Sequence, residues 1–310
     1  MTKDLALKYR PQTLDDIVGN KSTILSLKSV LHREQGPPKS FLFSGPSGCG
    51  KTTLAKILKK EFNCHDRDYH YYNTANTRGI DTIRDMGKLA QYSPLGGKVK
   101  FYLLDECHML TKDAQNALLL LLEDPPAPVY FALCTTNPEK LLDTIKTRCH
   151  KFPVVSLTRN LMLKLLREVI SKEFNDPFPD TILNEIAFCA QGSCRDALKM
   201  LDTVANIPDD DDALEAIRDS SVGETSTLEI CKLLLNGNKN KWEELSKMIK
   251  TVDAEPEKLR YSILGYLASV LLNNPKGDDR IGRMLSIFIN DNMYSGKGGI
   301  VLQLYLASKL

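Results

Sequence analysis

Residues 45–52 read Gly45-Pro-Ser-Gly-Cys-Gly-Lys51-Thr52, and this stretch decides the fold. It follows the apolar run KSFLFS at 39–44 and opens an amphipathic run, so it should join a strand to a helix. Glycines at such a junction let backbone N–H groups point inward and form a nest for an anion. The N-terminus of the following helix adds partial positive charge. The pattern is typical of a phosphate-binding loop.

The loop and the first turn of its helix supply a set of candidate nucleotide contacts. Lys51 would reach the β- and γ-phosphates of a bound nucleotide, and the Thr52 hydroxyl would ligate Mg²⁺. A chance glycine-rich turn is a poor competitor, because eight positions match in the right strand–loop–helix context. The candidate contacts are Gly45, Pro46, Ser47, Gly48, Cys49, Gly50, Lys51, Thr52 and Thr53.

A second apolar run, Phe101-Tyr-Leu-Leu, ends in two adjacent carboxylates, Asp105 and Glu106. Asp105 suits Mg²⁺, directly or through water, and Glu106 suits polarising the water that attacks a γ-phosphate. An acidic pair at a strand end is commonplace alone, but a phosphate loop lies upstream at a suitable distance. The two motifs together predict a nucleoside triphosphatase that uses Mg²⁺.

Three further polar residues stand at the ends of predicted elements. Thr136 follows the strand VYFALCT and could sense the γ-phosphate or simply cap the next turn. Arg148 precedes the last strand and could cap a helix C-terminus or reach a neighbour's nucleotide as an arginine finger. Arg195 lies in the first turn of a helix, where the dipole disfavours a cation, so we expect it to meet a phosphate.

The order of elements predicts an α/β protein with a parallel, Rossmann-like sheet followed by helical segments. Beyond residue 155 strand signals vanish, and apolar residues recur at three-and-four spacing. The acidic run PDDDD at 208–212 predicts a hinge or loop. We predict a nucleotide-binding core at 1–155, a helical lid at 156–212 and an all-α region at 213–310. The predicted strands are 39–44, 69–73, 98–104, 129–135 and 150–154, and the predicted helices are 22–33, 51–62, 79–91, 112–123, 157–173, 180–191 and 195–206.

Composition narrows the class without deciding it. A content of 42% hydrophobic and 26% charged residues is ordinary for a globular protein, and a net charge of +2 leaves nucleic-acid binding to a local patch. The N-terminus lacks the apolar region of a signal peptide, so we expect a cytosolic protein with no membrane partner. Eight scattered cysteines predict buried free thiols, and Cys64, His65 and His70 lack a fourth ligand for zinc.

Together these motifs resemble the clamp-loader branch of the AAA+ family, with features of both replication factor C small subunits and the bacterial gamma/tau subunit. The resemblance is dense from residue 5 to about 206 and weaker beyond, where only 298–306 is similar to the family's collar helices. Thr147-Arg148-Cys149 stands where the family writes Ser-Arg-Cys. The matching segments are Leu7-Lys-Tyr-Arg-Pro-Gln-Thr-Leu-Asp-Asp-Ile-Val-Gly19, Asn76-Thr-Arg-Gly-Ile-Asp81, Asp105-Glu-Cys-His-Met-Leu, Leu122-Glu-Asp-Pro-Pro and Thr135-Thr-Asn-Pro-Glu-Lys-Leu141.

The resemblance assigns roles that spacing alone does not. It makes Thr136 the first sensor, Arg195 the second, Arg148 a finger acting in trans, and Gln115 the residue that couples neighbouring ATP sites. It gives Tyr9, Arg10, Pro11 and Val18 to adenine binding. It also gives Arg78, Arg84 and Lys88 to the duplex, although a solvated helix face explains each of these three about as well.

The family implies ATP and Mg²⁺ as ligands, and a sliding clamp, primer–template DNA and other loader subunits in a pentamer as partners. The last region, 213–310, would be its oligomerising collar. The alternatives are a scaffold subunit that binds nucleotide without hydrolysis, or another AAA+ motor that works on DNA, such as a Holliday-junction motor or a helicase loader. Only Cys64 remains where the bacterial subunit has a four-cysteine zinc module. This departure suggests a compact loader, which we hypothesise to be encoded by a phage or other mobile element.

Overall fold

The computed structural model describes residues 4–220, 222–236, 241–251, 256–272, 274, 277–289 and 296–310. The chain divides into two compact units, Met1–Asn206 and Ile207–Leu310. The first unit holds the sheet and the helices around it, and in the described part of the second unit helices are the regular secondary structure, joined by short loops. The finer division into core, lid and collar stays a prediction.

A five-stranded parallel sheet forms the centre of the first unit, with the strand order β2-β3-β4-β1-β5. This confirms the predicted α/β fold, and every predicted strand is present within a few residues. Parallel strands end at the same edge of a sheet, so the residues that follow β1, β3 and β4 are brought together there. The strands are β1 (Ser40–Ser44), β2 (Tyr69–Asn73), β3 (Lys100–Asp105), β4 (Val129–Thr135) and β5 (His150–Pro153).

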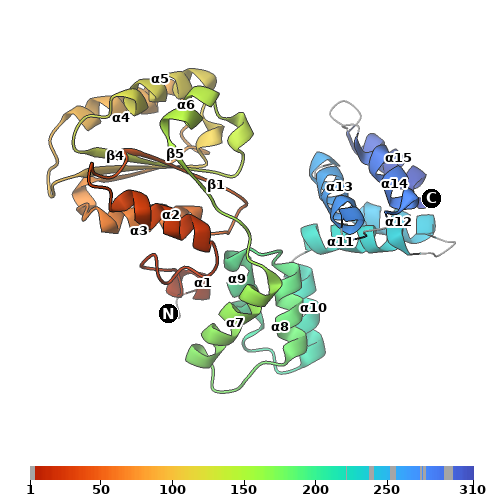
Figure 1. The fold of residues 1–310 in the computed structure, drawn as a ribbon. Helices are drawn as coiled ribbons and strands as arrows, with labels where there is room; N and C mark the ends of the chain where they lie inside the picture. The colour runs from red at the N-terminus through yellow and green to blue at the C-terminus, as the bar shows by residue number, and fades with distance from the viewer. Residues whose placement is uncertain are drawn as a thin grey trace. The chain divides into compact units, whose positions relative to one another are not determined.

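Helices cover both faces of the sheet, as Figure 1 shows. Because side chains alternate along a strand, Phe41 and Phe43 of β1 pack with α2 and α3, while Leu42 packs with α4, α5 and α6. Burial on both faces explains why the strands read as continuous apolar runs. The helices are α2 (Lys21–Leu31), α3 (Lys51–Glu61), α4 (Ile80–Gln91), α5 (Lys112–Glu123) and α6 (Asp143–Arg148), and three short 3₁₀ turns are η1 (Asp66–Asp68), η2 (Cys107–Met109) and η3 (Pro138–Lys140).

Three longer helices complete the first unit, together with a short N-terminal helix, α1 (Leu5–Lys8). They are α7 (Arg159–Glu173), α8 (Asp180–Cys189) and α9 (Cys194–Val204), and they match the predicted lid helices closely. A left-handed Gly192 separates α8 from α9, and the Ser193 hydroxyl caps α9 by accepting the Asp196 N–H at 3.3 Å. This cap fixes the start of α9 and therefore the position of Arg195 in its first turn.

One prediction about the second unit was partly wrong: the acidic run at 208–212, predicted as a hinge or loop, is only partly a loop. Asp210, Asp211 and Asp212 form the first turn of α10, and the Asp209 carboxylate accepts the N–H groups of Asp211 and Asp212 at 2.9 and 3.1 Å. Carboxylates favour a helix N-terminus, as both caps and partners of the dipole, so a run that reads as a breaker starts a helix.

The remaining helices share an apolar core that includes Ile230, Leu267 and Phe288. Cationic side chains bind the carbonyls at two helix C-termini: the half-buried Arg280 donates to the Leu234, Leu235 and Asn236 carbonyls, and the buried Arg260 donates to the Phe288 and Ile289 carbonyls. These helices are α11 (Val222–Leu235), α12 (Lys241–Thr251), α13 (Pro256–Leu272), α14 (Asp279–Ile289) and α15 (Gly296–Ser308), and α10 (Asp210–Ser220) precedes them.

Candidate nucleotide-binding site

The predicted phosphate-binding loop leaves β1 and ends where α3 begins, at Lys51. Gly45, Gly48 and Gly50 all have positive φ, so side chains would be strained at each of these positions. The Lys51 ammonium folds back over the loop and donates to the Gly45 and Pro46 carbonyls at 2.8 and 2.6 Å. Burial lowers the pKa of this ammonium, and the nearby Glu106 carboxylate opposes the effect. The loop therefore holds a positive charge in place beside its nest.

The carboxyl end of β3 faces this loop. The Thr52 hydroxyl donates to Asp105 Oδ2 at 3.0 Å, and the Tyr71 hydroxyl approaches the same oxygen at 3.3 Å. The buried Thr74 hydroxyl lies 3.0 Å from the Asp105 carbonyl oxygen and 2.6 Å from that of Glu106. The two predicted metal ligands, Thr52 and Asp105, are therefore neighbours. Hydrogen bonds from Tyr71 and Thr74 hold the end of β3 in place.

Glu106 stands at the turn into η2 with a left-handed backbone. Its Oε2 accepts a hydrogen bond from the Thr136 hydroxyl at 3.1 Å, so the predicted sensor and the predicted base are in contact. His108 Nδ1 lies 3.4 Å from the same oxygen and 3.1 Å from Thr135 Oγ1. Burial lowers the pKa of the His108 imidazole, with the Glu106 carboxylate acting in the opposite direction.

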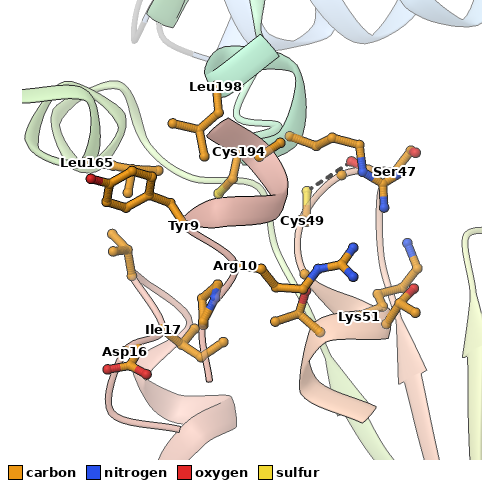
Figure 2. A pocket seen from close by; sticks show the side chains of 18 of the residues that line it. Tyr9, Arg10, Asp16, Ile17, Ser47, Cys49, Lys51, Leu165, Cys194 and Leu198 are labelled. Carbon is orange, nitrogen blue, oxygen red and sulfur yellow. Dashed lines mark hydrogen bonds between the residues drawn. The ribbon is translucent and has the colours of Figure 1, made fainter. Parts of the chain in front are cut away.

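One pocket collects most of the predicted residues (Figure 2). It is bounded by the phosphate loop, the N-terminal segment and one side of α9, all within the first unit. Its lining includes the predicted residues Tyr9, Arg10, Pro11, Val18, Ser47, Gly48, Cys49, Gly50, Lys51, Thr52, Thr53, Asp105, Glu106 and Arg195. Gly45 and Pro46 contribute the carbonyls under Lys51, and Thr136 reaches the site through Glu106.

The pocket also has walls that were not predicted as site residues from the sequence: Ala6, Asp16, Ile17, Leu165, Cys194 and Leu198. Leu165 of α7 and Leu198 of α9 lie near Tyr9 in Figure 2 and give the pocket an apolar side. Their sequence signal is ordinary helical spacing, which marks them as core residues and does not separate a pocket wall from a packed interior.

The N-terminal segment is tied to α7 by a polar contact. The Tyr9 hydroxyl donates to Glu173 Oε1 at 2.5 Å, and Lys8 Nζ donates to Glu173 Oε2 at 2.7 Å. Burial and the Glu173 carboxylate together raise the pKa of Tyr9 to about 12. The phenol therefore stays a donor at neutral pH, and its ring is held at the pocket wall.

The phosphate loop packs tightly against the start of α9. A Cβ placed on Gly48 would lie 1.9 Å from Ser193 Oγ, and the Cys49 thiol lies 3.5 Å from Ser156 Oγ and 3.9 Å from the Gly192 carbonyl oxygen. Because Arg195 follows Ser193 by two residues, this contact sets the distance between the loop and Arg195.

This contact gives a stability prediction with a matched control. Gly48→Ala should lower the free energy of unfolding by roughly 1–3 kcal/mol more than Gly50→Ala. Both glycines have positive φ, but only the Cβ at Gly48 displaces Ser193 and its cap, because nothing lies within 4 Å of a Cβ at Gly50. Urea unfolding of the two variants without nucleotide measures the difference. Equal losses would mean that the Ser193 contact adds nothing beyond backbone strain.

Gln115 lies outside the pocket and is buried, with 3% of its surface exposed. Its amide donates to the Leu110 and Lys140 carbonyls at 3.2 and 3.3 Å and accepts the Leu142 N–H at 2.9 Å. It therefore joins the segment after η2 to the segment that leads into α6. Within one chain this is a packing role, and the predicted coupling between neighbouring sites stays a prediction.

Arg148 also lies away from the pocket of its own chain, at the C-terminus of α6. It donates to the Thr144 carbonyl at 3.2 Å and forms an ion pair with Glu123 at the end of α5. The Arg148 side chain is 34% exposed. The helix-cap alternative is present, since the Thr144 carbonyl belongs to α6, and a contact with a neighbouring chain stays a prediction.

The three predicted DNA contacts lie on or just before α4, and all three are exposed. Arg84 and Lys88 pair with Asp81 and Asp85, one turn back on the same helix, at 3.3 and 2.9 Å. Arg78 precedes α4 and donates to the Ala75 carbonyl at 3.0 Å. The paired acids reduce the positive charge of this face, so its role in binding DNA stays a prediction.

The predicted free thiols are confirmed, since all eight cysteines are unbridged and every one except Cys194 is buried. In the described part of the chain, no three His, Cys, Asp or Glu side chains gather as a metal-holding group. No helix within the described ranges is both long and apolar enough to cross a bilayer.

Comparison with known proteins shows which proteins the chain is similar to. Residues 66–158 match the family described as DNA polymerase III, delta subunit. The tau/gamma subunit of DNA polymerase III from Haemophilus influenzae is 35% identical over 219 residues, covering 64% of this chain. The tau subunit from Escherichia coli is 30% identical over 291 residues, covering 86% of this chain. The chain is homologous to the tau/gamma subunits of bacterial DNA polymerase III. This homology confirms the resemblance to the clamp-loader branch of the AAA+ proteins.

The matches cover 32% of the Haemophilus protein and 45% of the Escherichia protein, so the chain spans less than half the length of either. Among solved structures, the Holliday junction branch migration motor RuvB from Thermotoga maritima has a TM-score of 0.57 at 21% identity, over 79% of this chain and 86% of that one. At this identity the likeness concerns the fold alone, and it agrees with the predicted AAA+ architecture.

Proposed function

We propose that the chain is an ATP-hydrolysing subunit of a clamp loader, which opens a sliding clamp and loads it onto primer–template DNA during replication. The observation that carries the proposal is a single pocket joining the phosphate loop, the Asp105–Glu106 pair, the N-terminal segment and Arg195. Homology to subunits of a DNA polymerase supports the replication setting, and with it a place in the cytoplasm (the host's, if a phage encodes the chain).

ATP would lie with its base against the N-terminal segment and its phosphates on the loop. Tyr9, Pro11 and Val18 would bind adenine beside the apolar walls from α7 and α9, and Arg10 would contribute charge at the same segment. The backbone N–H groups of the loop and the Lys51 ammonium would bind the β- and γ-phosphates. Arg195 would approach from α9, so that binding of ATP tightens α9 on the loop.

The residues where the end of β3 meets the start of α3 fit Mg²⁺. A hydroxyl and a carboxylate oxygen, Thr52 Oγ1 and Asp105 Oδ2, lie 3.0 Å apart, and such hard oxygen donors are what Mg²⁺ prefers beside phosphates. Bound there, the ion would neutralise charge on the phosphate oxygens. Before it binds, the Thr52 hydroxyl satisfies the Asp105 carboxylate, which keeps both groups in place.

Hydrolysis would use Glu106 to polarise the attacking water, with Thr136 fixing the carboxylate. Arg148 would act on the ATP of a neighbouring subunit, because it is remote from the pocket of its own chain and exposed at the end of α6. Gln115, which joins the segment beyond Glu106 to the segment leading into α6, would couple the two neighbouring sites.

Assembly would use the second unit as a collar, with a pentamer as the expected ring. Support comes from α15, which is apolar on nearly all sides. Ile300, Leu304 and Ala307 are buried in the core of the unit, whereas Leu302 and Leu306 are 57% and 45% exposed. An apolar face of this kind is suited to a helix of another subunit. Arg78, Arg84 and Lys88 would track the phosphate backbone of the duplex.

A scaffold subunit that binds ATP without turnover is the alternative. Lys51, Thr52, Asp105 and Glu106 are all present and all line one pocket, which favours turnover over scaffolding.

Steady-state ATP hydrolysis tests the proposal. The full chain, assembled with its genomic partner subunits where these are needed, is assayed alone, with primed DNA, and with primed DNA plus the cognate clamp. We expect weak turnover alone and synergistic stimulation by clamp and DNA together. Stimulation by DNA that is indifferent to the clamp would point to a remodelling motor or helicase loader. Tight ATP binding with no turnover under any condition would leave the scaffold.

A further inference from the structure

His108 has a position that the proposed function does not use. Its side chain is 11% exposed, in η2 between the Glu106 carboxylate and the end of β4. Nδ1 lies 3.4 Å from Glu106 Oε2 and 3.1 Å from Thr135 Oγ1. The Thr135 hydroxyl in turn accepts the Asn137 N–H at 3.0 Å. The imidazole therefore links the predicted base to the end of the strand that carries the predicted sensor.

The two carboxylate oxygens of Glu106 differ in the number of polar contacts that they make. Oε2 accepts the Thr136 hydroxyl and faces His108 Nδ1, while no hydrogen bond to Oε1 occurs within the described residues. A carboxylate held through one oxygen presents the other to water in a fixed direction. Two groups on Oε2 define that direction better than one, because a single hydrogen bond leaves the carboxylate free to rotate about it.

We propose that His108 is a positioning residue for Glu106: its Nδ1, hydrogen-bonded to Thr135 Oγ1 at 3.1 Å and lying 3.4 Å from Oε2, holds Oε2 together with Thr136 and so directs Oε1 at the attacking water. The inference rests on the proposed ATP hydrolysis. A carboxylate neighbour favours the tautomer with hydrogen on Nδ1, and this single hydrogen is shared between Thr135 Oγ1, the nearer acceptor, and Glu106 Oε2. Thr135 Oγ1 has two lone pairs, so it can accept from His108 as well as from Asn137. His108 is not among the residues that line the pocket, so it would act through Glu106.

The arrangement makes the site sensitive to pH. Three charged groups act electrostatically on the imidazole: Glu106 beside it, Lys140 from η3 and Lys51 from α3. Burial lowers the pKa of His108, the two lysines lower it further, and Glu106 opposes them. The imidazole is therefore neutral at neutral pH. As the pH falls through this lowered pKa, a positive charge appears beside Glu106 and makes its carboxylate a weaker base, so turnover falls on the acid side.

Two substitutions separate positioning from packing. His108→Asn places an amide N–H near the position of Nδ1 and does not titrate, whereas His108→Leu fills similar space without a donor. We expect His108→Leu to lower kcat about tenfold with little change in KM for ATP, since positioning losses are smaller than removal of a base. His108→Asn should retain most of kcat and lose the acid limb of the pH profile. If wild type, His108→Leu and His108→Asn share one kcat and one pH profile, the inference is wrong.

A second measurement needs no turnover. The chain has five histidines, so the imidazole ¹H–¹³C signals of the full-length protein can be assigned and titrated by NMR. In Glu106→Gln the pKa of His108 should fall relative to wild type, because the carboxylate that raises it is gone. An unchanged His108 pKa would overturn the contact itself. If wild type hydrolyses no ATP under any condition, the proposed function fails, while this titration still decides whether His108 faces Glu106.

Discussion

Glu106→Gln should abolish ATP hydrolysis while ATP binds with nearly wild-type affinity. The amide oxygen can still accept from the Thr136 hydroxyl, which lies 3.1 Å from Oε2, so the side chain should keep its place. It cannot take a proton from water, and loss of a positioned base lowers turnover by roughly 10²–10⁴-fold. The contacts that hold the phosphates, the loop and Lys51, are unchanged, so the dissociation constant should change little.

The measurement pairs steady-state hydrolysis with equilibrium binding of a fluorescent ATP analogue. Asp113→Asn is the matched control, since it removes an exposed carboxylate from the first turn of α5, away from the pocket. This control should hydrolyse and bind like wild type. Turnover in Glu106→Gln within a few-fold of wild type would remove Glu106 as the base. Loss of binding together with turnover would instead mean that Glu106 shapes the pocket.

The fold was predictable because its signals are local. Strands β1, β3 and β4 are buried on both faces and therefore read as unbroken apolar runs, and the loop at 45–52 marks the end of β1. Parallel topology then places the residues after these strands at one edge. The meeting of Thr52 with Asp105, and of Glu106 with Thr136, follows from that geometry. The prediction of a loop at the acidic run 208–212 was partly wrong, because helix starts and loops favour the same residues.

Other features depend on packing between distant segments and leave no local signal. The pocket walls Leu165 and Leu198 resemble any buried helical leucine. The Glu123 partner of Arg148 belongs to another helix, and its identity depends on how α5 and α6 pack. The position of His108 between Glu106 and Thr135 depends on the turn of η2. The sequence identifies the residue type and its possible chemistry, but the contacts of such residues are known only from the folded structure.

Arg148→Ala should remove stimulated ATP hydrolysis while ATP binding and folding survive. An arginine finger contributes roughly 10³–10⁵-fold to turnover, and none of that depends on the chain's own pocket. The ion pair with Glu123 is exposed to solvent, and such pairs contribute about 0–1 kcal/mol, so unfolding should hardly change. Lys146→Ala is the control on the same helix, because Lys146 pairs with Asp143 at 2.7 Å within α6 and should not be needed for turnover.

Mixing two inactive variants decides whether Arg148 acts in trans. Arg148→Ala subunits keep an intact base, and Glu106→Gln subunits keep an intact finger. In a mixed ring, some Arg148→Ala sites will face a Glu106→Gln neighbour, so activity should return on mixing although each variant alone is inactive. If Arg148 served the ATP of its own chain, every subunit would still lack one group and the mixture would stay inactive. Recovery therefore requires a catalytic site shared between two chains, because no other arrangement brings an intact Glu106 and an intact Arg148 to one ATP.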